Sequence, residues 1–140
     1  MNIKDERALS RALRASIYST VLAVETGSTA TGLPDLLVLG TRAAWVELKV
    51  DTLLRTSQLN RINELIRAGQ RVVLVRYNRK NDSVSMTCLN DARVFPMFAD
   101  LVTGEKQMNR QTFDELFVDE KEYTIRECGW QLTMYVLGDV

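Results

Sequence analysis

Two apolar runs joined by a short turn constrain this chain most, because they predict a buried β-hairpin. They span residues 32–49, GLPDLLVLGTRAAWVELK, with the turn at Gly40-Thr41-Arg42. Leu, Val and aromatic residues dominate both runs, as is typical of strands. Charged residues interrupt the hairpin only at Asp35, Arg42, Glu47 and Lys49. Burying a charge is costly unless it is paired or holds a metal, so these charges require a chemical reason.

The turn decides which of these charges meet. Glu47 and Lys49 are two residues apart, so their side chains point to the same face of a strand. A turn of residues 40–43 places Asp35 near Leu48 and within about one residue of Glu47, where cross-strand neighbours lie roughly 5–8 Å apart. Two carboxylates and one ammonium group are therefore expected at one end of the hairpin.

This combination of charges predicts a site for a hard divalent cation. Mg²⁺ prefers oxygen ligands and is usually bound through one or two carboxylates, so Asp35 and Glu47 are the expected ligands of Mg²⁺ or Mn²⁺. Lys49 then remains available to orient a water molecule or to stabilise the charge of a phosphate group.

The same residues resemble the PD-(D/E)XK nuclease superfamily. Pro34-Asp35 is followed after eleven residues by Glu47-Leu48-Lys49, and the similarity continues through Ser57-Gln58-Leu59 and the run AGQRVVLV at residues 68–75. The pattern is most similar to the virus-type replication-repair nuclease (VRR-NUC) branch, which resembles Holliday-junction resolvases, and it covers roughly residues 5–77. The resemblance implies an α/β, restriction-endonuclease-like core with a central mixed β-sheet flanked by helices (αβββαβ), followed here by a C-terminal α+β extension.

The resemblance also implies further site residues. The Leu48 carbonyl would join Asp35 and Glu47 as a metal ligand, and Gln58 would approach the site from the next helix rather than serve as a plain surface residue. A glutamate on the first helix often completes the metal site in related nucleases, and Glu6 is the expected counterpart. The alternative for Glu6 is an ordinary acidic residue favoured by the dipole at a helix start.

Basic and hydroxyl residues around this motif are expected to contact nucleic acid. The expected phosphate contacts are Arg7, Arg11 and Arg14 on a helix predicted over 3–16, and Arg55, Arg61 and Arg67 near the next helix. The Gly-, Ser- and Thr-rich loop of residues 25–32, including Thr31, either contacts phosphates or is a simple surface connection. Glu25, at its start, is a second, weaker candidate for the extra acidic ligand.

Length and charge agree with one domain that carries a basic face. The 140 residues suffice for a single domain, with a core of about 1–90 and an extension of about 91–140. Residues 1–80 contain 13 Lys and Arg against 7 Asp and Glu, net +6, whereas residues 81–140 contain 5 against 11, net −6. The half with the motif is thus basic, as a phosphate-binding surface requires, although solvated helix faces also produce such asymmetry.

Several classes of site are excluded by composition. The chain has no histidine, which excludes histidine-based triads, histidine-ligated zinc and histidine-metal nucleases. Cys88 and Cys128 form no CxxC motif, so we expect reduced core thiols rather than zinc ligands, with a disulfide as the alternative. Neither a membrane-spanning stretch nor a signal-peptide pattern is present, and we expect a soluble cytoplasmic protein, in the host cytoplasm if a phage encodes it.

The other elements follow from periodicity and turn residues. We expect a strand within 17–25 that pairs with the hairpin, a helix from an N-cap at Ser57 to Gly69, a buried parallel strand at 71–77 and an antiparallel edge strand at 83–89. The acidic C-terminal region is expected to hold a short helix or loop at 93–102 interrupted by Pro96, a short helix at 112–117, and strands at 123–126 and 131–137, the last alternatively helical.

Together these features predict a metal-dependent endonuclease that hydrolyses DNA phosphodiester bonds. The resemblance implies branched or junction DNA as the substrate, in replication, recombination or repair, and a phage or prophage origin; the compact chain without an added DNA-reading module agrees with this substrate, and we expect a symmetric homodimer. One alternative is a nuclease for single-stranded DNA or for RNA. The other is a non-catalytic DNA- or protein-binding module on a nuclease-like fold, against which stands the intact set of Asp35, Glu47 and Lys49.

Overall fold

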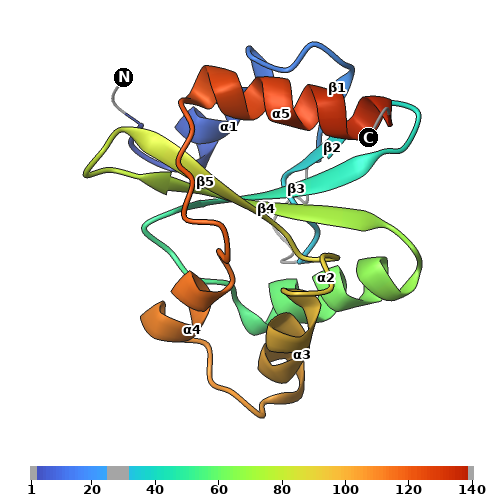
Figure 1. The fold of residues 1–140 in the computed structure, drawn as a ribbon, viewed down its shortest axis with the longest axis vertical. Coiled ribbons are helices and arrows are strands. Elements are labelled where there is room, and N and C mark those ends of the chain that lie inside the picture. The colour runs from blue at the N-terminus through green and yellow to red at the C-terminus, as the bar shows by residue number, and fades with distance from the viewer. Residues whose placement is uncertain (1–2, 25–31, 139–140) are drawn as a thin grey trace.

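A five-stranded mixed β-sheet forms the centre of the computed structural model, which describes residues 3–24 and 32–138 (Figure 1). Its strands lie in the order β1 (Val21–Ala23), β2 (Leu36–Val38), β3 (Ala44–Val50), β4 (Arg71–Asn78) and β5 (Ser83–Cys88). The helices are α1 (Glu6–Arg14), α2 (Thr56–Arg67), α3 (Phe95–Thr103), α4 (Arg110–Glu115) and α5 (Ile125–Leu137). β3 and β4 are parallel and the other neighbours antiparallel, which confirms the predicted α/β class with a mixed sheet between helices.

The β2–β3 hairpin differs from its expected register by one residue. Val38 pairs with Ala44 and Leu36 with Val46, so the connection spans residues 39–43 rather than 40–43. Continued by one residue, this register puts Asp35 opposite Glu47, closer than predicted. The reason lies outside the turn: Gly40 packs against α5, where an added Cβ would lie 2.4 Å from the Val136 carbonyl oxygen.

Helix α2 makes the crossover that parallel strands β3 and β4 require. It begins at Thr56 with Arg55 as the N-cap, not with the predicted N-cap Ser57. The Gln58 side chain accepts a hydrogen bond from the Arg55 backbone N–H at 2.9 Å and thereby satisfies one of the free donors at the helix start. The helix ends as predicted, because Gly69 adopts a φ of 84°, which glycine tolerates best.

Two apolar cores lie on opposite faces of the sheet, with α1 and α5 covering one face and α2, α3 and α4 the other (Figure 1). Alternation along β3 divides its side chains between them. Val46 and Leu48 belong to the core under α1 and α5, whereas Trp45 packs in the core under α2. Glu47 therefore shares its face with Trp45 and faces α2.

The predicted C-terminal β-hairpin is wrong and the helical alternative for the last segment is confirmed, because residues 125–137 form the single helix α5. Thr124 and Glu127 form a reciprocal capping box in which each side chain accepts a hydrogen bond from the other's backbone N–H. The buried residues Ile125, Cys128, Leu132 and Val136 then make one helical stripe on the sheet. The Thr-x-x-Glu signal was present in the sequence, but the alternating run after it obscured the helical period.

The remaining elements are close to those expected. Pro96 lies in the first turn of α3 and starts that helix instead of interrupting it, because proline fits the first turn of a helix. The antiparallel edge strand β5 is confirmed, and an isolated bridge joins its Val84 to Tyr123. Cys88 and Cys128 are both free thiols. Within residues 3–24 and 32–138, no helix has the length and apolar character needed to cross a bilayer.

The close contact between α5 and the segment after α1 predicts that a Gly→Ala substitution in α5 destabilises the protein. In an exposed helix, Gly→Ala stabilises by about 1 kcal/mol. At Gly129 in α5, however, an added Cβ would lie 2.3 Å from the Ser16 carbonyl oxygen, so the helices must separate. We expect Gly129→Ala to lower the free energy of unfolding by about 1–3 kcal/mol in denaturant titrations. The exposed neighbour Gln131→Ala is the control and should be nearly neutral; stabilisation by Gly129→Ala would contradict the contact.

Candidate active site

Two charged side chains are buried side by side on β3. Glu47 is 1% exposed and Lys49 is 4% exposed, and they are the only fully buried charged residues in the described part of the chain. Gln58, from the first turn of α2, is 6% exposed and lies against both. The crossover from β3 into α2 thus places three polar groups beside the buried apolar residues Leu59 and Ile62 of α2.

The Gln58 amide connects the two buried charges. Its Nε2 donates a hydrogen bond to Glu47 Oε2 at 3.2 Å, and its Oε1 accepts one from Lys49 Nζ at 2.9 Å. Lys49 Nζ also lies 3.7 Å from Glu47 Oε2. An amide offers a donor on one side and an acceptor on the other, so it suits a carboxylate and an ammonium group at once. Gln58 therefore belongs to the site and is not a surface residue.

Asp35 reaches the same place from the segment before β2. Its Oδ2 accepts a hydrogen bond from the Leu48 backbone N–H at 2.8 Å, beyond the last residue pair of the hairpin. This bond fixes the carboxylate beside β3 on the edge that β2 leaves uncovered. The predicted convergence of Asp35, Glu47 and Lys49 is present in the structure.

Gly32 positions Asp35, a role that sequence analysis missed. Its φ is 76°, and a Cβ at this position would lie 2.1 Å from the Ser57 carbonyl oxygen. Only a residue without a side chain lets the segment before Asp35 approach the first turn of α2 so closely. The Gly-Leu-Pro-Asp string contained the signal, since glycine three residues before a functional residue indicates a special backbone conformation.

Burial shifts both carboxyl groups toward protonation, and the charge of Asp35 adds to the shift of Glu47. Burial is the main cause that raises the pKa of Asp35, and the Leu48 N–H opposes it. The pKa of Glu47 is raised well above its ordinary value, first by burial and then by the charge of Asp35, while Lys49 opposes the shift. In addition, Glu47 Oε1 is buried without a hydrogen-bond partner among the described residues. The metal-free pair is therefore electrostatically unfavourable.

Glu6 lies near this pair but makes a different contact. Its Oε1 accepts a hydrogen bond from Thr52 Oγ1 at 2.9 Å. Its charge adds a smaller contribution that raises the pKa of Asp35. The described residues contain no group of three or more His, Cys, Asp or Glu side chains arranged to hold a metal. Asp35 and Glu47 thus form a pair, with Glu6 set apart from it.

The predicted phosphate contacts have mixed surroundings. Arg7, Arg11 and Arg14 are all exposed on α1. Arg55 and Arg67 are exposed at the two ends of α2, whereas Arg61 is partly buried and pairs with Glu64 at 3.4 Å. Thr31 and Glu25 lie outside the described residues. The α2 arginines lie on the helix that carries Gln58, whereas those of α1 lie on the helix that covers the other face of the sheet, and the contact of both groups with nucleic acid stays a prediction.

No protein-family model matches this sequence, and no curated protein matches it. The site must therefore be interpreted from its own chemistry. Two adjacent carboxylates with one unsatisfied oxygen can bind a hard cation. An ammonium group held beside them can stabilise negative charge on a bound anion.

The raised pKa values predict how stability depends on pH without a metal. Both folded-state pKa values exceed the unfolded ones, so the folded protein keeps protons that the unfolded chain has released. This stabilising contribution is complete below the unfolded pKa and is lost as pH rises through the folded pKa. We expect the free energy of unfolding to fall as pH rises above about 5, and to fall less steeply in Asp35→Asn.

Denaturant titrations in chelator at several pH values between about 5 and 8 measure this slope. The chain has no histidine, so few other side chains titrate in that range. Glu64→Gln, which removes an exposed carboxylate from α2, is the matched control and should keep the wild-type slope. Identical slopes for wild type and Asp35→Asn would contradict the proposed repulsion.

Proposed function

We propose that this protein is a Mg²⁺- or Mn²⁺-dependent nuclease of the PD-(D/E)XK type that hydrolyses DNA phosphodiester bonds on a restriction-endonuclease-like core. One observation carries the proposal: Asp35, Glu47 and Lys49 converge at one buried point, with Glu47 Oε1 left unsatisfied. A buried pair of like charges is unfavourable unless something compensates for it. A divalent cation would provide that compensation.

The donor set suits such an ion. Asp35 and Glu47 supply carboxylate oxygens, and the unpartnered Oε1 is available for coordination. A residue in an extended strand directs its N–H and C=O to the same edge, and the Leu48 N–H points to Asp35, so the Leu48 carbonyl lies on that side too. Oxygen ligands alone favour Mg²⁺ or Mn²⁺ over softer metals. When bound, such an ion lowers the pKa of its water and neutralises charge on the scissile phosphate.

The protein's own residues then have separate tasks. Lys49 holds its ammonium group beside the carboxylates, where it can orient the attacking water and stabilise charge that develops on the phosphate oxygens. Gln58 holds both Lys49 and Glu47 and is a positioning residue. Gly32 lets the segment that carries Asp35 pass close to the first turn of α2. The first turn of α2 thus holds the site residues of β3 through Gln58.

The exposed arginines of α1 and the basic character of residues 1–80 favour a nucleic acid as substrate. Branched DNA and a homodimeric enzyme remain our predictions, and a nuclease for single strands or RNA is the main alternative. A non-catalytic binding module does not require the buried and electrostatically unfavourable set of Asp35, Glu47 and Lys49. For this reason we favour an enzyme.

Cleavage assays test the chemistry. Asp35→Asn, Glu47→Gln and Lys49→Ala should each lower the rate with Mn²⁺ at least about 100-fold, because each removes charge needed in the transition state. Supercoiled, single-stranded and four-way-junction DNA are the substrates, and DNA binding is measured in parallel and should persist. The exposed changes Glu64→Gln and Lys80→Ala are matched controls. Near-normal cleavage by any of the three site variants would refute its assignment.

Metal binding can be tested without a substrate. Saturating Mg²⁺ or Mn²⁺ should raise the melting temperature of the wild type, because a ligand at a hundred times its Kd adds about 2.7 kcal/mol to folding stability. Asp35→Asn should lose most of this gain while the metal-free variant stays as stable as the wild type or becomes more stable. Equal responses of wild type and Asp35→Asn to the ion would remove the physical basis of the proposal.

A further inference from the structure

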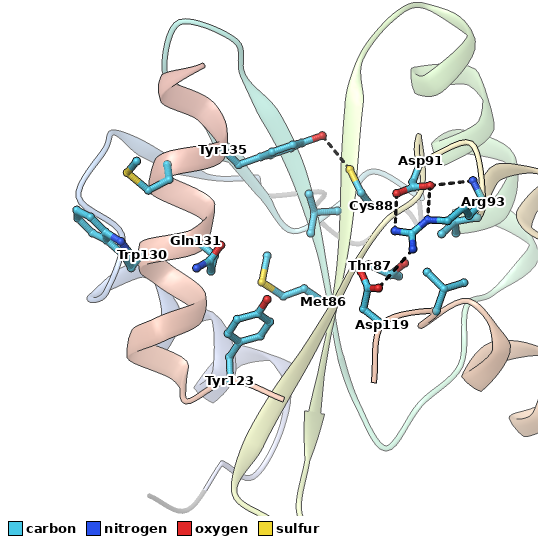
Figure 2. Close-up of a pocket in the computed structure, with 14 residues that line it drawn as sticks. Met86, Thr87, Cys88, Asp91, Arg93, Asp119, Tyr123, Trp130, Gln131 and Tyr135 are labelled. Carbon is cyan, nitrogen blue, oxygen red and sulfur yellow. Dashed lines mark hydrogen bonds and ion pairs between the residues drawn. The ribbon is translucent and has the colours of Figure 1, made fainter. Parts of the chain in front are cut away.

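A groove lies at the β5 edge of the sheet, between β5 and α5, and encloses about 600 Å³ (Figure 2). In Figure 2, α5 forms one wall with Trp130 and Tyr135, and the other wall carries Arg93 with Asp91 and Asp119. Further lining residues are mainly apolar: Val73, Met86, Val94, Val118 and Met134. None of them belongs to the proposed nuclease site.

The hydrogen-bond pattern of β5 shows that its backbone faces this groove. The Leu89 N–H donates to the Val72 carbonyl at 2.9 Å, so residues at odd positions of β5 bond to β4. The even positions, Val84, Met86 and Cys88, therefore direct their backbone groups away from β4. Val84 confirms this direction, because it exchanges two hydrogen bonds with Tyr123, at 2.7 and 2.8 Å.

Among the described residues, the chain pairs with this edge only at the isolated bridge between Val84 and Tyr123. An antiparallel strand continued from Tyr123 would place residue 121 opposite Met86, but two carboxylates hold this segment elsewhere. Asp119 pairs with Arg93 at 3.4 Å, and Glu122 accepts hydrogen bonds from Ser83 Oγ at 2.6 Å and from Asn78 Nδ2 at 3.0 Å. These anchors keep the edge open beside Met86.

The open edge offers specific backbone groups. The outward N–H and C=O of Met86 and the N–H of Cys88 have no partner within residues 3–24 and 32–138, whereas the Cys88 carbonyl accepts from the Asp91 N–H. These three backbone groups lie along the same edge of β5, so one added extended strand could form hydrogen bonds with all of them. The pairing that Val84 makes with Tyr123 shows that this edge accepts an antiparallel neighbour.

We propose that the groove between β5 and α5 binds an extended, uncharged, apolar peptide segment of a partner protein as an antiparallel strand at Met86 and Cys88. The volume lies in the range of sites that enclose small ligands and can take alternate side chains of the peptide. Arg93 pairs with both Asp91 and Asp119, so its wall offers no unpaired cation to an acidic peptide.

The groove's shape also argues for a single strand over a second copy of this chain. The β5 edge lies between the wall of α5 and the wall that includes Arg93 and Asp119 (Figure 2). The equivalent edge of another copy would carry the same two walls, so we expect a single strand to reach the edge of β5 more easily than a second sheet edge. Trp130, 51% exposed at the rim, offers a large apolar surface to a peptide that passes over it.

A proline substitution tests this pairing selectively. Because the Met86 N–H points into the groove, Met86→Pro removes one docking group and leaves the β4–β5 hydrogen bonds in place; proline is tolerated in edge strands with this geometry. The probe is a phage-displayed library of random octapeptides, with the enriched sequences resynthesised as free peptides. We expect uncharged sequences with alternating apolar residues that bind the wild type and Met86→Leu equally and bind Met86→Pro at least tenfold more weakly.

Two further measurements keep the proposal falsifiable if Met86→Pro folds poorly. N-methylation of the peptide residue opposite Met86 should abolish binding to the wild type, and hydrogen exchange at the Met86 amide should slow when the unmodified peptide binds. No enriched sequence, or binding that survives both Met86→Pro and peptide N-methylation, would overturn the proposal. A wild-type dimer in light scattering that Met86→Pro dissociates, with no peptide binding, would assign the edge to a second copy and would also overturn it.

Discussion

The geometry of the candidate site depends on the hydrogen bonds of the Gln58 side-chain amide. It satisfies the Arg55 N–H at the start of α2, and it also binds Glu47 and Lys49 on β3. The helix start and the buried charges are thus fixed by one side chain. Because α2 is also the crossover between β3 and β4, the position of the site follows from the parallel pairing of these strands. A shift of α2 would disturb the fold and the site together.

The apolar cores on both faces of the sheet compensate for the unfavourable charges between them. The core beneath α1 and α5 includes Val46 and Leu48, and the core beneath α2, α3 and α4 includes Ile62 and Phe98. Each fully buried side chain of this kind contributes about 1.5–3 kcal/mol relative to an exposed one. Such burial allows the metal-free protein to fold despite the raised pKa of Glu47. The cost of that pair is what we expect a bound cation to remove.

Two stretches of strand edge lack a neighbouring strand, one on β3 and one on β5, and they differ in how their backbone groups are used. Beside β3, beyond the end of β2, the Asp35 carboxylate occupies the edge and accepts from the Leu48 N–H. Beside β5, Tyr123 occupies only the position of Val84, and the groove next to α5 leaves Met86 open. The first edge is filled by a functional side chain, and the second is available to an added strand. The proposed catalysis and the proposed peptide binding are therefore spatially separate and can be tested independently.

The sequence alone determined the elements whose signals are local, and the tertiary structure decided those that depend on distant contacts. Alternation and the Gly-Leu-Pro-Asp and Glu-Leu-Lys strings predicted β2, β3 and the meeting of Asp35 with Glu47, because strand period and a short turn set these positions. The hairpin register was missed by one residue, since packing of Gly40 on Val136 involves the far end of the chain. Residues 123–126 and 131–137 alternate enough to suggest strands, yet residues 125–137 form α5. Only a helix brings Ile125 to the same face as Cys128 and Leu132, because in a strand Ile125 and Cys128 would point to opposite faces. The open edge of β5 could not be predicted from local pattern, because it depends on ion pairs and hydrogen bonds that Asp119 and Glu122 make with residues far away in the sequence.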